Sequence, residues 1–88
     1  DIYTIENALD KVSKMRGVMF TRKDTGEKGT GVIAQEIQKV LPEVVSEDPN
    51  GNLSVAYTEV IPLLVAAINE QQEIINQLKS RIEVLEAK

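Results

Sequence analysis

Eighty-eight residues, 42% hydrophobic and 27% charged, describe one small globular domain rather than a disordered tail or a membrane protein. The lack of Cys excludes disulfides and thiolate metal sites, and the lack of His removes the commonest general base. The net charge of −4 argues against a general nucleic-acid binder, and the longest apolar run, Val60 to Ile68 with Pro62 inside it, is too short to span a membrane.

A chain this short is marginally stable alone, and without disulfides or metals such chains most often gain stability by forming oligomers. The sequence begins with Asp1 rather than Met, so we expect it to be a piece of a longer polypeptide. Its charge is uneven, because residues 11–28 are mainly basic and residues 29–59 mainly acidic. Either ordinary solvated faces or charge complementarity between packed subunits would account for that asymmetry.

The first predicted element is a short helix followed by a hairpin. Thr4 can cap a helix that buries one face and stops at Gly17; its apolar residues are Ile5, Ala8, Leu9, Val12 and Met15. Residues 18–22 are rich in β-formers and predict a strand, and residues 30–33 predict its return strand. The polar, glycine-containing residues 24–29 predict the connection, with a protruding tip.

A second helix is predicted from Ala34 to Leu41, where Pro42 ends it. Val44-Val45 predicts a short strand that pairs with residues 53–57 across the turn Asp48-Pro49-Asn50-Gly51. Thr58 is the predicted cap of a long terminal helix, with Pro62 in its first turn. The predicted core consists of Val32, Ile33, Ile37, Val40, Leu41 and Tyr57.

The terminal helix carries a heptad repeat. Its first core position holds Ile61, Ile68, Ile75 and Ile82, and its second holds Leu64, Gln71, Leu78 and Leu85. A strict seven-residue repeat is typical of a left-handed coiled coil between chains, whereas a helix lying on its own domain usually shows a wider apolar stripe. Arg81 and Glu86 have the spacing of a pair between parallel neighbours. Ile at the first core position and Leu at the second favour a two-stranded coiled coil, and the polar Gln71 could specify either two or three helices. Dimer and trimer therefore stay open.

No constellation for catalysis is present. The serines have no His partner and none begins a Ser-x-x-Lys motif. The glycines at 26, 29 and 31 are not followed by a phosphate-binding helix start, and no metal or cofactor site is predicted. Taken by itself, the sequence indicates an assembly module.

Three stretches carry a resemblance to a known family: residues 5–12 (IENALDKV), 31–45 (GVIAQEIQKVLPEVV) and 57–68 (YTEVIPLLVAAI). In that order they resemble the intramolecular chaperone domain at the C-terminus of bacteriophage tailspikes and tail fibres, best known from the endosialidase tailspike. The resemblance covers essentially the whole chain. It implies an α+β fold in which residues 1–58 form a small globular part with a protruding hairpin and residues 59–88 a parallel coiled coil, together one chaperone domain.

The resemblance also implies a homotrimer, which favours three strands over two. The domain would guide the preceding fibre of the same polypeptide to trimerise and fold, in the host cytoplasm during virion assembly, while the parent protein belongs to the virion tail. Its partners would be two further copies and that fibre, with no nucleic acid and no membrane. The alternative is a passive coiled-coil oligomerisation module without chaperone activity.

Release of the family's domain uses self-cleavage by a Ser-Lys dyad. The family's motif, Ser-Asp followed by Leu-Lys, would lie before the segment that matches Asp1 to Ile5, so neither dyad residue maps onto this sequence. We therefore expect no peptidase activity and no catalytic residue here, although the parent would cleave itself.

Two sets of residues are assigned to function. The predicted trimer interface is Ile61, Leu64, Ile68, Gln71, Ile75, Leu78, Ile82 and Leu85. The alternative prediction places these residues in an intramolecular core. The hairpin tip is predicted to contact the client, because a long polar loop can reach beyond the body; it comprises Asp24, Thr25, Gly26, Glu27 and Lys28.

Overall fold

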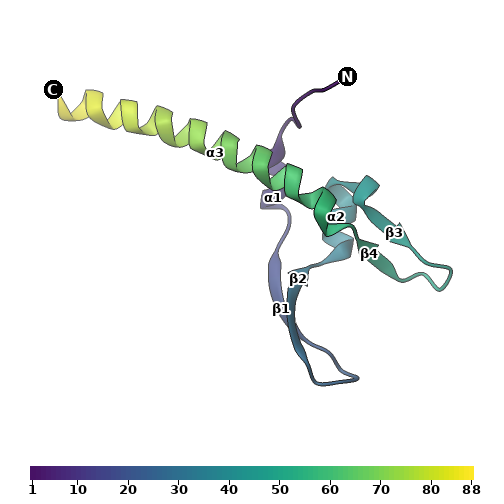
Figure 1. Ribbon diagram of the computed structural model, residues 1–88. Coiled ribbons are helices and arrows are strands. Elements are labelled where there is room, and N and C mark those ends of the chain that lie inside the picture. Colours follow the sequence, from purple (N-terminus) through teal and green to yellow (C-terminus); the bar gives the residue numbers. More distant parts are fainter.

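The computed structural model describes residues 1–88 and is organised around one long helix, α3. The remaining helices and two β-hairpins gather at the N-terminal end of α3, and its C-terminal part projects alone (Figure 1). The molecule measures 62 × 38 × 18 Å. Its shape is therefore a small head on a bare stalk.

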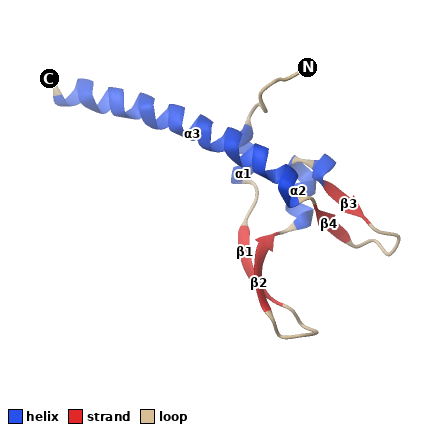
Figure 2. Cartoon of the chain, in the orientation of Figure 1, coloured by secondary structure: helices blue, strands red, loops and turns tan.

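The elements in chain order are α1 (Ala8–Ser13), β1 (Gly17–Thr21), β2 (Lys28–Val32), α2 (Ala34–Val40), the 3₁₀ turn η1 (Pro42–Val44), β3 (Val45–Glu47), β4 (Leu53–Val55) and α3 (Tyr57–Glu86). The strands form two separate antiparallel hairpins, β1–β2 and β3–β4 (Figure 2). The predicted α+β class with a long terminal helix is confirmed.

The start of α1 differs from the prediction. The helix begins at Ala8 rather than after Thr4, and Asn7, in the left-handed conformation with φ of 55°, precedes it without a side-chain cap. Its predicted apolar face is confirmed, since Ile5, Leu9, Val12 and Met15 pack against the buried Ala8 and its neighbours. The helix ends at Ser13, so Gly17 is not its stop signal but the first residue of β1.

The two hairpins have the predicted order with shifted limits. β1 pairs with β2 from Gly17↔Val32 to Thr21↔Lys28, so both strands start earlier than predicted and Lys28 is a strand residue. In the second hairpin Val45 pairs with Val55, as expected, but Val44 belongs to η1. Gly51, with φ of 84°, closes the predicted turn.

The long helix begins one residue earlier than its predicted cap. Tyr57 is its first residue, Ala56 holds the cap position, and no side chain caps it, so the assignment of Thr58 is wrong. Pro62 is the sixth helical residue and therefore lies in the second turn, not the first. Because proline has no N–H, the carbonyl of Thr58 lacks the donor that an ordinary residue would provide.

The core is small and divided. One cluster joins Ala8 of α1 to Leu63 and Ala67 of α3, and the other joins Ile37 and Val44 to Val60 of α3. Of the predicted core, Ile37 is fully buried; Val32, Ile33, Val40 and Leu41 are half-buried. Tyr57 is exposed instead, because it begins α3 and does not continue the strand that was predicted to bury it. Only six of 88 residues are buried, so the single chain has little apolar burial to stabilise it.

Candidate functional site

The two sides of α3 differ sharply near the head. Val60, Leu63 and Ala67 are buried against α1, α2 and η1, and their spacing of three and four residues defines one side of the helix. We call the eight predicted interface residues the seam; those near the head, Ile61, Leu64 and Ile68, each follow a buried residue by one position, about 100° around the helix. The seam therefore lies to one side of the surface of α3 that packs on the head of its own chain.

All eight predicted interface residues are exposed in the single chain. The seven apolar ones are 39–66% exposed, and from Gln71 to Lys88 no residue is buried or half-buried. The rival prediction of an intramolecular core is inconsistent with this placement. What remains is an apolar strip along the stalk that its own chain does not cover.

Glu70 fixes α1 to α3, a role that the sequence analysis missed. Its Oε2 accepts a hydrogen bond from the N–H of Ala8 at 2.7 Å, and its Oε1 accepts one from the N–H of Leu9 at 3.2 Å. Glu70 thereby serves as the cap that Asn7 does not provide. The helical spacing could have indicated this role, because Glu70 follows Ala67 by three residues and so lies on the side of α3 that faces the head.

The predicted client-contact residues lie at the free end of the β1–β2 hairpin, pointing away from α3 (Figure 1). The tip is ordered by its own bonds. The N–H of Gly26 donates to the carbonyl of Arg22 at 2.8 Å, and the N–H of Arg22 donates to the carbonyl of Glu27 at the same distance. Arg22 Nη2 also lies 3.0 Å from Asp24 Oδ2, and the side-chain hydrogen bond from Arg22 lowers the pKa of Asp24.

The uneven charge is partly satisfied within the chain. Arg16, from the basic segment, donates from Nε to Glu36 Oε2 at 2.9 Å, and its Nη2 lies 2.8 Å from the same oxygen. The hydrogen bond to Glu36 is the main cause of the raised pKa of Arg16. Lys14 pairs with Asp10 at 3.2 Å. The Arg16–Glu36 pair thus joins the basic and acidic segments within one chain, whereas Asp10 lies outside both segments.

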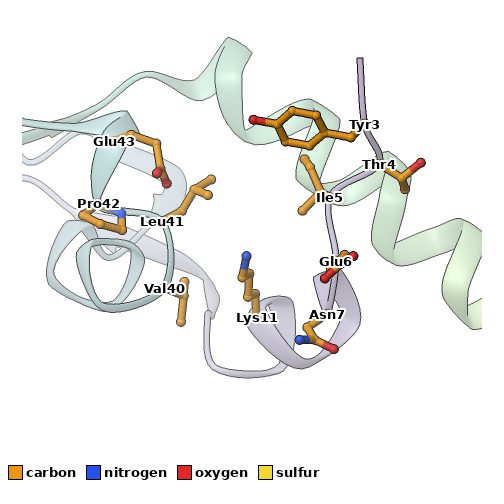
Figure 3. Close-up of a pocket in the computed structure, with 10 residues that line it drawn as sticks. All are labelled: Tyr3, Thr4, Ile5, Glu6, Asn7, Lys11, Val40, Leu41, Pro42 and Glu43. Carbon is orange, nitrogen blue, oxygen red and sulfur yellow. The ribbon is translucent and has the colours of Figure 1, made fainter. Parts of the chain in front are cut away.

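A groove of about 910 Å³ separates the N-terminal segment from the end of α2 (Figure 3). Tyr3, Ile5 and Asn7 lie on one side, and Leu41 and Glu43 on the other. Lys11 projects between the two walls.

No group of three or more His, Cys, Asp or Glu side chains lies close enough together to hold a metal ion. No helix has the length and apolar content needed to cross a bilayer.

A small head, a projecting hairpin and a long helix with an uncovered heptad seam are features of an assembly domain. The family described as the chaperone of endosialidase matches residues 1–46, and this chain belongs to it. That match contains α1, the β1–β2 hairpin and α2.

Known relatives extend the similarity into α3. The long tail fiber protein Gp37 of Escherichia phage AR1 is 42% identical over 80 residues, covering 80% of this chain and 7% of its own length. Gp37 of Enterobacteria phage K3 is 39% identical over 87 residues, which cover 89% of this chain and 7% of that protein. Gp37 of Enterobacteria phage M1 is 35% identical over 86 residues, which cover 86% of this chain and 34% of that protein. The chain therefore spans a small part of the relatives it matches.

Proposed function

We propose that this chain is an intramolecular chaperone, which acts as a parallel homotrimer to align and fold a phage tail fibre to which it is joined. Residues 59–88 form the coiled coil, and residues 1–58 form the head that meets the client. The fibre folds in the host cytoplasm during virion assembly and ends in the virion tail.

The observation that carries the proposal is the uncovered seam of α3. Four heptads place seven apolar residues and Gln71 on one line of the stalk, all exposed in the single chain. Helices with such a line associate so that each side chain fills a hole in the neighbouring helix. The family and the Gp37 relatives supply the client class, a phage tail fibre.

A chaperone of this kind solves a kinetic problem. Fibres whose chains wind around each other require contacts between residues far apart in sequence, and such assembly is slow and prone to aggregation. A coiled coil forms from local contacts and holds the chains together at high effective concentration. Once the fibre is kinetically trapped, the clamp is dispensable, which is why release by cleavage upstream of Asp1 belongs to the proposal.

The number of chains is tested by light scattering across a dilution series. We expect a constant molar mass near three times 9.7 kDa. A mass of two chains would contradict the trimer, and a monomer at micromolar concentration would contradict the coiled coil itself.

Chaperone action is tested by co-expression of the fibre with altered heads. Replacing Lys23–Gly26 by Asn-Gly shortens the β1–β2 tip to a tight two-residue turn. We expect unchanged trimer mass but a lower yield of protease-resistant fibre, while Asn50→Ala, at the tip of the other hairpin, leaves the yield unchanged. If an unrelated trimeric coiled coil replaces the whole chain without loss of yield, the chain is a passive oligomerisation module.

Self-release is tested in the longer polypeptide. Replacing the expected Ser of the upstream Ser-Asp motif by Ala should leave one full-length product, whereas the unaltered polypeptide should give two fragments. An uncut product in both cases would contradict self-cleavage without affecting the chaperone proposal.

A further inference from the structure

The seam of α3 continues one layer beyond the residues with which the heptad count began. Tyr57 lies seven residues before Leu64, so it occupies the same heptad position one repeat earlier. It is the first residue of α3 and is 54% exposed. Tyr57 and Ile61 therefore lie on one side of the helix, and much of each side chain is uncovered.

Tyr57 also rests on β2. The N–H of Val32 donates to Tyr57 Oη at 3.4 Å, and a Cβ added to Gly31 would lie 2.7 Å from the same oxygen. Glycine at position 31 thus leaves the space in which the phenol sits. Through this contact the start of the stalk is joined directly to the β1–β2 hairpin.

Phe20 lies beside Tyr57 on the same face of the hairpin. The strand register pairs Phe20 with Gly29, and a Cβ on Gly29 would lie 2.8 Å from Phe20 Cζ. Phe20 also approaches the Cβ position of Gly31 to 3.6 Å, so both rings lie against Gly31 of β2. Met19, the preceding residue in β1, points to the opposite face because side chains alternate along a strand.

Both aromatic residues are only partly covered within the chain. Phe20 remains 45% exposed, Tyr57 54% and Ile61 55%. Together these residues make an apolar strip that leaves the stalk and runs onto the hairpin. A neighbour that packs against Ile61 and Leu64 lies along the same line of α3 as Tyr57, and its own head is then beside this strip.

Because the strip is continuous with the seam, we infer that a second copy of this chain covers it. The interface between copies extends from the coiled coil, through Tyr57, onto the Phe20 face of the β1–β2 hairpin. This inference rests on the proposed assembly and adds a consequence to it. Since Tyr57 lies in the stalk and contacts the hairpin, assembly fixes the angle at which the hairpin tip is presented to the client.

Single cysteines test the extended interface, because the natural chain has none. Ile61→Cys, Tyr57→Cys and Glu59→Cys are oxidised mildly and separated without reductant. We expect disulfide-linked dimers from Ile61→Cys and Tyr57→Cys, but not from Glu59→Cys, which lies on the far side of the same helical turns.

The outcomes separate the inference from the proposal beneath it. Linkage through Ile61→Cys without linkage through Tyr57→Cys would mean that the seam ends at Ile61. That result would overturn the inference but not the proposed assembly. No linkage through either would overturn the proposed assembly as well. Equal linkage through Glu59→Cys would mean random collision and would also overturn the inference.

The hairpin part is tested by sedimentation equilibrium of Phe20→Ser and Met19→Ser, with amide NMR showing that the hairpin remains formed. Loss of a large interfacial aromatic contact should raise the midpoint concentration for dissociation about tenfold for Phe20→Ser. Met19→Ser, on the other face, should leave it unchanged. Equal effects of the two substitutions on the midpoint overturn the inference. It is also overturned if Phe20→Ser self-associates normally and lowers only the yield of native fibre, because the client would then cover the strip.

Discussion

Glu70 determines where α1 begins, and its carboxylate acts over a sequence separation of 62 residues. The two N–H groups that it accepts belong to the first turn of a helix whose own flanking residue provides no cap. A half-buried carboxylate in that position satisfies donors that would otherwise be left without partners and also interacts favourably with the helix N-terminus.

We therefore predict that Glu70→Ala lowers the free energy of unfolding by about 1–2 kcal/mol, the usual cost of losing a cap. Glu70→Gln should lose less, since its amide oxygen still accepts one bond. The control is Glu73→Ala, an exposed residue one turn further along α3. Urea denaturation at one fixed chain concentration gives the measurement. Equal losses for Glu70→Ala and Glu73→Ala would contradict the capping role.

Asp48 organises the β3–β4 turn in a similar way, but locally. Its Oδ1 accepts hydrogen bonds from the N–H groups of Asn50 and Asn52, each at 2.9 Å, and its Oδ2 accepts one from Asn52 Nδ2 at 3.2 Å. The bond from the Asn52 N–H is the main cause that lowers the pKa of Asp48 below its ordinary value of 3.8.

A lowered pKa in the folded state means that the carboxylate stabilises the turn above the unfolded-state pKa. This contribution disappears as the pH falls through the folded-state pKa. We predict that the amide protons of Asn50 and Asn52 titrate in NMR with a midpoint below 3.8, the ordinary value. In Asp48→Asn this titration should vanish. A midpoint at or above that value in the unaltered chain would contradict the hydrogen-bonding argument.

At the scale of elements, α3 performs two tasks on different sides. Its first three turns bury Val60, Leu63 and Ala67 in the head, while the remaining stalk exposes the seam together with Ile74 and Val84. Gln71 lies in the seam just beyond the part of α3 that packs on the head. A polar residue at a core position typically specifies register or oligomer number and lowers stability.

We predict that Gln71→Leu raises the thermal midpoint of the assembly and allows more than one oligomeric state. The reason is that burial of Leu in place of a polar amide is favourable, while the element that specified a single arrangement is lost. Thermal unfolding followed by circular dichroism, together with mass by light scattering, checks both parts. A lower midpoint with an unchanged single mass would contradict a seam position for Gln71. Gln77→Leu, on the other side of the stalk, is the matched control.

At the scale of the whole molecule, the single chain is far from compact. Its radius of gyration is 17.9 Å, whereas a compact domain of this length has about 12 Å. Its accessible surface is 7260 Å², roughly 2000 Å² more than a globular monomer of 9.7 kDa exposes. Both quantities follow from the bare stalk, and both support the proposed association between copies.

We predict that Ile75→Asp converts the assembly to monomers at micromolar concentration, because three carboxylates cannot be buried together without partners. Ile75 lies beyond the head, so the head's own core is untouched. Gln77→Asp adds the same charge outside the seam and should keep the original mass. Sedimentation velocity gives the result, and an unchanged mass for Ile75→Asp would exclude it from the interface.

The order and type of the elements were predictable from the sequence because they depend on local rules. Apolar spacing predicted α1, α2 and α3, and Asp48 to Gly51 predicted the second turn. The element limits were less accurate where they depend on distant partners. Thr4 was assigned as a cap since it is a good local one, but α1 takes its cap from Glu70.

The sequence by itself determined the family resemblance, the α+β order and the line of heptad residues, since each is a pattern along one chain. Only the tertiary structure decided which side of α3 meets the head and which stays uncovered. It also placed Tyr57 outside the core, over Gly31 and beside Phe20. The physical reason is that burial depends on how separate elements pack, and residues such as Glu70, Tyr57 and Phe20 acquire their contacts only when α1, β1, β2 and α3 come together.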